Sequence, residues 1–244
     1  MTEHARPAVE RRGTLSKDAV LRAAVAVADE GGIGALTMRG LARRLGVEAM
    51  SLYHHVADKD EVLDGIVEIV VSEINDRVDD PAVPADGTGW KAVVRQRILT
   101  ARAVMLAHPW VPGVMESRRT MGRAALRYHD GLARLMREGG CSIDLVHHAM
   151  HALGSRAIGF VQELYAAGDA ADADDADPEM EAIMLGQMAA EYPFITEIVT
   201  AAGHTGEDTL GWCDDQVEFE FGLDLLLVGL ERLRLREAQE GAQV

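Results

Sequence analysis

The 244-residue sequence has few cysteines and no long apolar run, and each absence excludes a class of protein. The two cysteines, Cys141 and Cys213, lack the CxxC or metal-type spacing of a zinc or redox site, so we expect reduced, structural thiols. No apolar run is long enough to cross a bilayer, and the N-terminus has no secretory apolar core. We therefore expect a cytoplasmic protein with no membrane contact.

Catalytic signatures are also missing. The chain has no GxSxG sequence, no phosphate-binding loop, no HExxH and no Cys–His signature. The paired carboxylates Asp174–Asp175 and Asp214–Asp215 lie in acidic stretches, where a solvated surface is the simpler interpretation. Aromatic residues make up 5% of a chain that is 48% apolar, which at this length fits a soluble helical protein with a small head and a larger core. We expect neither an enzyme nor a bound cofactor.

Positive charge is scarce over the whole chain, whose net charge is −16, but the deficit is uneven. Residues 1–60 hold nine Lys and Arg against eight Asp and Glu, whereas residues 61–244 hold 15 against 32. The basic residues that give the N-terminal part a local positive surface are Arg6, Arg11, Arg12, Arg39, Arg43, Arg44 and Lys59. This distribution favours DNA contact by the N-terminal part, while the acidic remainder limits nonspecific binding.

The most informative stretch that is present covers residues 36–63, LTMRGLARRLGVEAMSLYHHVADKDEVL. Its spacing predicts a helix of about nine residues that begins near Thr37, a good N-cap, and ends at Gly46, which tolerates a left-handed backbone. Val47 would fill the corner before a second helix at 48 to about 54. Two short helices around a tight turn are typical of a helix-turn-helix unit that binds DNA.

A longer helix follows, because Asp58 is a good cap and Glu61 stands three residues on, as in a capping box. Lys59 would lie at its first turn, where a DNA phosphate would pass. One apolar face continues to about residue 78, so this helix would link the head to the rest of the chain as a single rod.

The segment resembles the DNA-binding domain of the TetR family of bacterial repressors. Six features match in the family's order: Leu36-Thr37, Leu41-Ala42, Leu45-Gly46-Val47, Leu52-Tyr53, His55-Val56 and Lys59. The resemblance implies that base and phosphate contacts fall on Thr37, Met38, Arg39, Ala49, Met50, Ser51, Tyr53, His55 and Lys59. Ala49-Met50-Ser51 replaces the Gln-Pro-Thr of the tetracycline repressors, so we do not expect a shared operator.

Apolar periodicity and caps predict an all-helical protein, with further helices at about 16–30, 90–107, 120–138, 142–166, 214–237, a short one after Pro109 and one from Pro178. We expect a three-helix head joined by a long helix to a helical ligand-binding and dimerisation domain. The boundaries are a flexible basic arm at 1–15, the helix-turn-helix domain at 16–60, the second domain at 61–238 with an acidic mobile loop at about 167–177, and a tail at 239–244.

The last helix predicts a homodimer because it is apolar on two sides. One side carries Phe219, Leu223 and Leu230, and other apolar residues such as Leu225 and Val228 lie elsewhere around the helix. Residues 219–233 and the sequence Glu191-Tyr192-Pro193 resemble the C-terminal domain of the tetracycline-repressor type. That resemblance implies a four-helix dimer bundle and a pocket for a small inducer in each core. Two heads about 34 Å apart would read a palindromic operator.

The inducer is expected to differ from a metal–tetracycline complex. Asn75, Arg97 and Met115 stand where that type has a ring-binding histidine, an asparagine of the fifth helix and a metal-ligating histidine, and only Glu163 matches an acidic position. An apolar or aromatic ligand fits better, since methionines adapt to irregular shapes. Packing remains the alternative role for each candidate ligand residue: Asn75, Met105, Trp110, Met115, Tyr128, Met150, His151, Phe160 and Glu163.

We interpret the sequence as a ligand-responsive, sequence-specific DNA-binding regulator that represses transcription until its inducer binds. Its expected partners are double-stranded DNA with a palindromic operator, a small inducer and a second copy of the chain. Two alternatives stay open at this point. One is a helical-bundle enzyme, and the other is a metal-responsive regulator that uses His147 and His151, which lie four apart on one helix.

Overall fold

A computed structural model describes residues 15–78, 89–118, 121–159, 178–201 and 215–241. Every regular element within these ranges is a helix, in agreement with the predicted all-helical class. The predicted arm at 1–15 (except Leu15), the acidic loop at about 167–177, the last residues of the tail, and Cys213 lie outside the described residues. No helix in the described ranges is both long and apolar enough to cross a membrane.

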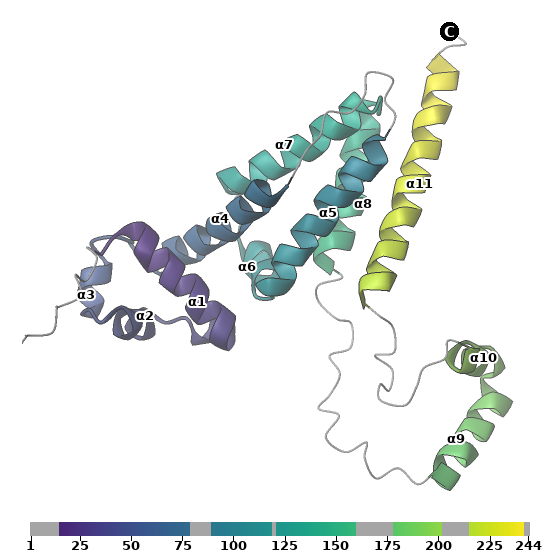
Figure 1. Cartoon of the computed structure of the whole chain (residues 1–244), viewed down its shortest axis with the longest axis horizontal. Helices are drawn as coiled ribbons and strands as arrows, with labels where there is room; N and C mark the ends of the chain where they lie inside the picture. The colour runs from purple at the N-terminus through teal and green to yellow at the C-terminus, as the bar shows by residue number, and fades with distance from the viewer. Residues whose placement is uncertain (1–14, 79–88, 119–120, 160–177, 202–214, 242–244) are drawn as a thin grey trace, which may run out of the picture.

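Three helices form the head: α1 (Lys17–Ala35), α2 (Met38–Leu45) and α3 (Ala49–Leu52). They lie together at one end of the molecule (Figure 1). Their buried residues include Val20, Leu41 and Leu52, all with no exposed surface. This cluster continues without a break into α4 and α6, so the head shares its apolar core with the neighbouring helices.

Helix α4 (Lys59–Arg77) is the rod that joins the two parts. It packs on α1 at its head end and on α5 (Trp90–Ala107), α6 (Val111–Ser117) and α7 (Arg123–Glu138) along the rest of its length. Helix α7 in turn packs on α8 (Ile143–Gly159). Helices α7 and α4 therefore connect α8 with the head through successive packing contacts.

Helix α11 (Asp215–Gly241) closes the larger domain by packing on α5 and α8. Phe219, Leu223 and Leu227 are buried in a second apolar cluster with residues of α5, α7 and α8. Helices α9 (Pro178–Glu191) and α10 (Pro193–Ala201) contact each other, and Figure 1 draws them apart from the other helices.

Several helix ends differ from the sequence prediction. Helix α1 extends past residue 30 to Ala35, but Gly32 has φ 70° and ψ 170°, so the predicted stop is a break inside the element. Helix α3 ends at Leu52 and turns through residues 53–55, two residues short of the prediction. Helix α7 begins at Arg123 after Gly122 rather than near Thr120, and α10 was not predicted as a separate helix.

Candidate DNA-binding surface and ligand-binding domain

The turn between α2 and α3 has the geometry that the sequence predicts. Gly46 is left-handed, with φ 66° and ψ 33°. The Gly46 N–H donates to the carbonyl of Arg43 at 3.2 Å, and the Val47 N–H donates to that of Ala42 at 3.0 Å. This pair of bonds is a Schellman motif, which ends a helix and reverses the chain at low cost. Val47 packs half-buried against the shared core, as expected of the corner residue.

Side-chain caps fix where α2 and α4 begin. The Thr37 hydroxyl accepts from the Gly40 N–H at 3.0 Å, and the Asp58 carboxylate accepts from the Glu61 N–H at 2.8 Å. Glu61 returns a bond to the N–H of Ala57 and pairs with Lys17 of α1. These bonds satisfy helix N-terminal N–H groups that would otherwise lack partners.

Part of the predicted set of DNA-contact residues is exposed, and the rest is half-buried. Met50 is 70% exposed and Tyr53 is 44% exposed, and Thr37, Arg39 and Lys59 are exposed as well. Leu52 and Val56, on the inner side of the same turn, are buried. The half-buried members of the predicted set are Met38, Ala49, Ser51 and His55. His54, which we did not predict, is exposed beside them.

Some cationic side chains in the described part of the head form ion pairs within the protein, and others do not. Arg44, counted as part of the positive surface, instead pairs with Glu30 of α1 at 2.5 Å. This pair lowers the pKa of Glu30, chiefly through the hydrogen bond. Within the described ranges, Arg39, Arg43 and Lys59 make no ion pair or side-chain hydrogen bond. These three positive charges are available for phosphates.

Two polar junctions fasten the head to the larger domain. Asp29 of α1 accepts from the indole N–H of Trp110 at 2.7 Å and lies 2.7 Å from Nδ1 of His108. At the start of α4, Arg118 donates to the carboxylates of Asp60 and Asp64 at 3.0 and 3.2 Å. The orientation of the head therefore depends on residues that follow α5 and α6.

The candidate ligand residues do not share one lining. Met105 and Trp110 are buried in the core that the head shares, with Met115 and Tyr128 packed against it. Asn75 donates to the backbone carbonyls of Val71 and Ala124, at 3.1 and 2.9 Å. Met150 packs half-buried on the second cluster and His151 is exposed on α8, while Phe160 and Glu163 lie outside the described residues.

The sequence did not predict that two arginines, Arg97 and Arg102, are buried in the interior of the larger domain. Arg97 is 4% exposed, donates to the Tyr128 carbonyl at 2.9 Å and lies 4.6 Å from the centre of the Tyr128 ring. Arg102 is 3% exposed, donates to Gln216 at 3.0 Å and lies 4.3 Å from the centre of the Phe219 ring. Stacking on aromatic faces and hydrogen bonding offset the cost of burying each charge.

The histidine pair of α8 does not form a complete metal site in the described ranges. The rings of His147 and His151 are 4.8 Å apart between centres, and His148 is also close to His147. No group of three or more histidine, cysteine or acidic side chains suited to a metal occurs among the residues that the structure describes. The buried Cys141 is free, and burial raises the pKa of its thiol to about 11, as fits an unreactive structural thiol.

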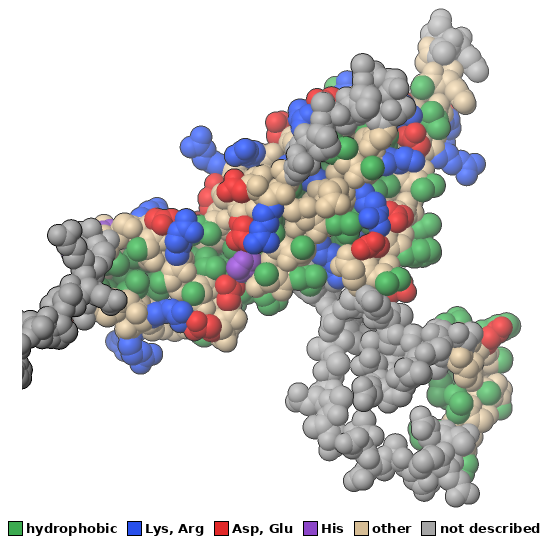
Figure 2. Space-filling view, in the orientation of Figure 1, with side chains coloured by type: hydrophobic (Ala, Val, Ile, Leu, Met, Phe, Trp, Pro, Cys, Tyr) green, Lys and Arg blue, Asp and Glu red, His purple; other side chains and the backbone are tan. Residues whose placement is uncertain are grey.

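Helix α11 has the second apolar side that the sequence predicts. Opposite the buried residues it exposes apolar side chains that Figure 2 shows along its outer edge, namely Val217, Phe221, Leu225, Val228 and Leu235. Phe221 is 61% exposed and Val228 is 62% exposed. An exposed apolar strip of this length is typical of a contact surface.

The fold and the exposed turn define the class: a helical DNA-binding regulator with a helix-turn-helix head. Comparison with known families agrees. Residues 20–66 match the family model of "Bacterial regulatory proteins, tetR family", and residues 83–234 match the "Tetracyclin repressor-like, C-terminal domain". The chain therefore belongs to the TetR family, whose members are regulators and not enzymes.

Relatives span nearly the whole chain. The HTH-type transcriptional repressor DrrR1 of Streptomyces coeruleorubidus is 29% identical and covers 97% of this chain and 85% of its own. The class C tetracycline repressor protein of Escherichia coli is 27% identical, over 91% and 93%. The crystal structure of ActR from Streptomyces coelicolor in complex with (S)-DNPA is 25% identical, with a TM-score of 0.66 over 89% and 98%.

Proposed function

We propose that the protein is a homodimeric transcriptional repressor that acts in the cytoplasm on a palindromic operator and releases it when a small, largely apolar or aromatic inducer binds. The observation that carries this proposal is the turn at Gly46, which exposes Met50 and Tyr53 while burying Leu52. Similar proteins include a named repressor and a regulator crystallised with a small molecule, which supports both halves of the proposal.

On DNA, the available cations and the exposed side chains would have different tasks. Lys59, at the first turn of α4, would contact a phosphate together with Tyr53 and His55. Met50 and Ser51 would reach base edges from α3, and Arg39 would contact both a phosphate and a base. Each good bidentate base contact contributes roughly 1–3 kcal/mol of discrimination. Thr37 would act mainly by holding the start of α2, since its hydroxyl is engaged as a cap.

Release would follow from the route through α7 and α4. A ligand bound between α4 and α8 would displace α7, which packs on both, and so tilt the head at the end of α4. Because two heads must match two half-sites, a tilt in each subunit changes their separation and weakens operator binding. Tyr128 supports an aromatic ligand, since its ring packs against the apolar cluster that contains Val71 of α4.

The proposal is tested by selecting bound duplexes from a random pool and then screening small molecules for release of the enriched duplex. Arg39→Ala should relax the preference at particular base positions. The matched control is Arg43→Ala, an exposed arginine on the same helix outside the contact set, which should leave base preference unchanged. Equal, uniform loss of affinity for both variants would remove base recognition by Arg39 from the account.

Dimerisation is tested separately by sedimentation. Leu225→Asp places a charge in the exposed strip of α11 and should shift the protein from dimer to monomer. Leu126→Asp introduces the same change at an equally exposed leucine of α7, 55% against 58%, and should leave the dimer intact. A wild-type chain that stays monomeric at high concentration would contradict the proposed homodimer.

A further inference from the structure

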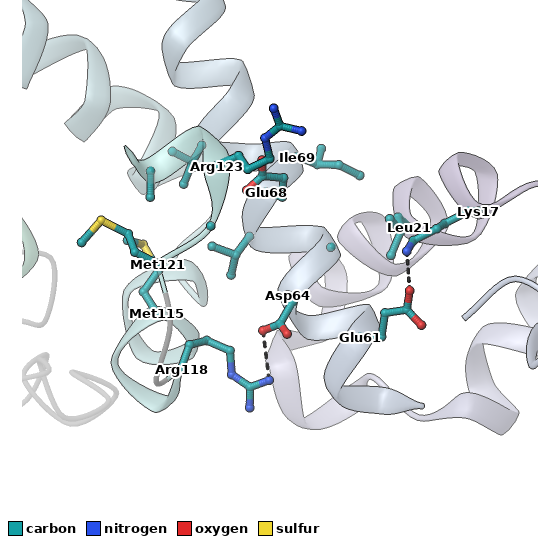
Figure 3. Close-up of a pocket in the computed structure, with 15 residues that line it drawn as sticks. Lys17, Leu21, Glu61, Asp64, Glu68, Ile69, Met115, Arg118, Met121 and Arg123 are labelled. Atoms are coloured by element: carbon teal, nitrogen blue, oxygen red, sulfur yellow. Dashed lines mark hydrogen bonds and ion pairs between the residues drawn. The ribbon is translucent and has the colours of Figure 1, made fainter. Parts of the chain in front are cut away.

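A groove of about 740 Å³ lies where the head meets the larger domain, outside the region between α4 and α8. Figure 3 shows its walls: α1 contributes Lys17 and Leu21, α4 crosses the middle, and the far side comes from α6 and the start of α7, with Met115 and Met121. A volume of this size is within the range of small-molecule pockets. Of the candidate ligand residues, Met115 alone lines it.

Two glycines shape the groove by letting neighbouring segments approach. A Cβ on Gly65 of α4 would lie 2.5 Å from Cδ2 of Leu21, so the glycine lets α1 lie directly against α4. A Cβ on Gly122 would lie 2.4 Å from Oε2 of Glu68, so the start of α7 also lies close to α4. Apolar residues also line the groove, among them Val67, Ile69 and Met115.

The charged side chains around the groove differ in whether they already have hydrogen-bond or ion-pair partners. All three lining carboxylates have donors: Glu61 has Lys17 and the Ala57 N–H, Asp64 has Arg118 at 3.2 Å, and Glu68 has the Ala124 N–H at 2.9 Å. Within the described ranges, the Arg123 guanidinium makes no ion pair or hydrogen bond. The lining therefore offers the Arg123 guanidinium as a positive charge that no carboxylate of the described residues holds; Glu61 and Asp64 are paired with cations, and Glu68 accepts from a backbone N–H.

We propose that this groove binds an elongated, mainly apolar small molecule that carries one acidic group. Its apolar body would lie over Leu21, Met115 and Met121, and its acid would pair with Arg123 at the rim. The two methionines suit this role because their flexible thioethers adapt to the shape of a ligand. The site goes beyond the proposed function, and its test needs neither DNA nor an identified inducer.

The site also has a position that matters mechanically. One wall belongs to the head through α1, and the opposite wall belongs to the segment around Arg118 that holds Asp60 and Asp64 of α4. A molecule in the groove would contact both walls and could therefore change the angle between them. The groove is in this respect unlike a pocket enclosed by the larger domain.

The test uses the full chain and two aromatic probes that differ in charge: 8-anilinonaphthalene-1-sulfonate, which is an anion, and N-phenyl-1-naphthylamine, which is neutral. We expect saturable binding of one sulfonate probe per chain. Arg123→Glu should weaken it by about tenfold or more, as fits the loss of a charged hydrogen bond. The neutral probe should change by less than about twofold, because the apolar wall is unaltered.

Three further variants make the result specific. Arg127→Glu carries the same charge change one turn along α7, outside the lining, and should alter sulfonate binding by less than about threefold. Arg123→Gln removes the charge without reversing it and should also weaken binding of the sulfonate probe. It keeps the test valid if the charge reversal disturbs folding. Met121→Asp should weaken both probes. Equal affinities for wild type and Arg123→Glu, or equal losses for Arg123→Glu and Arg127→Glu, would overturn the proposal.

Discussion

Glu231 should stabilise the protein at neutral pH and lose this effect in acid, because it joins the first turn of α5 to α11. Its carboxylate accepts from the buried indole N–H of Trp90 at 3.0 Å and from Arg234 at 2.8 and 2.9 Å. The hydrogen bonds from Arg234 lower the pKa of Glu231 from 4.5 to about 2, against the effect of burial and with help from Trp90.

The size and the sign of the effect follow from that shift. A pKa that is lower in the folded than in the unfolded chain stabilises the fold above the unfolded value, and the stabilisation disappears as the pH falls from about 4.5 to about 2. Each pKa unit corresponds to about 1.4 kcal/mol, so a shift from 4.5 to about 2 contributes at most about 3.5 kcal/mol at neutral pH. The Glu231 side chain is 24% exposed. Solvent therefore screens its ion pair with Arg234 less than it screens a fully exposed pair.

Urea unfolding of wild type and Glu231→Gln between pH 7 and pH 3 measures this contribution. We expect the variant to be less stable by up to about 3.5 kcal/mol at pH 7 and the difference to shrink as the pH falls. The control is Glu240→Gln on the same helix, since that side chain is 70% exposed and lies 3.7 Å from Arg236. A constant difference across the pH range, or equal losses in the two variants, would refute the reasoning.

Two other predictions concern DNA binding and packing. Lys59→Ala should weaken binding to all duplexes and make the dependence of log affinity on log salt shallower by about one per half-site, whereas Lys91→Ala on α5 should leave the slope unchanged; an unaltered slope for Lys59→Ala would remove it from the phosphate contacts. Gly139→Ala should lower the free energy of unfolding by roughly 1–3 kcal/mol, because the new Cβ would lie 2.5 Å from Cγ of the buried Trp90. Gly154→Ala on α8, which has open space around its Cβ, is the control in urea unfolding and should be neutral or stabilising; equal losses in the two would contradict the packing argument.

Features that depend on neighbouring residues could be predicted from the sequence. The end of α2 at Gly46 and the start of α4 after Asp58 follow from backbone and capping preferences that act over a few residues. The two-sided character of α11 follows from its apolar spacing, because helical periodicity places Phe219 and Phe221 on different faces. These features are enough to predict the fold class and the exposed turn between α2 and α3.

Features assembled from distant segments could not be predicted. Arg97 is buried against Tyr128, 31 residues away, and Arg102 against residues of α11, so neither arginine carries a local sign of its partner. Helix α3 is shorter than predicted because the chain turns at Tyr53, whose N–H bonds to the carbonyl of Met50. The groove at the head has walls from α1, α4 and α7, and spacing within any one helix does not place them together.

The central claim is that two copies of the turn at Gly46 present their α3 side chains to two half-sites of one operator. The most direct measurement is the sequence pattern enriched from a random pool of duplexes by the full-length protein. The account predicts two inverted copies of one short motif with centres about 10–10.5 base pairs apart, or a multiple of that spacing. A single asymmetric motif, or no enrichment over the starting pool, would contradict it.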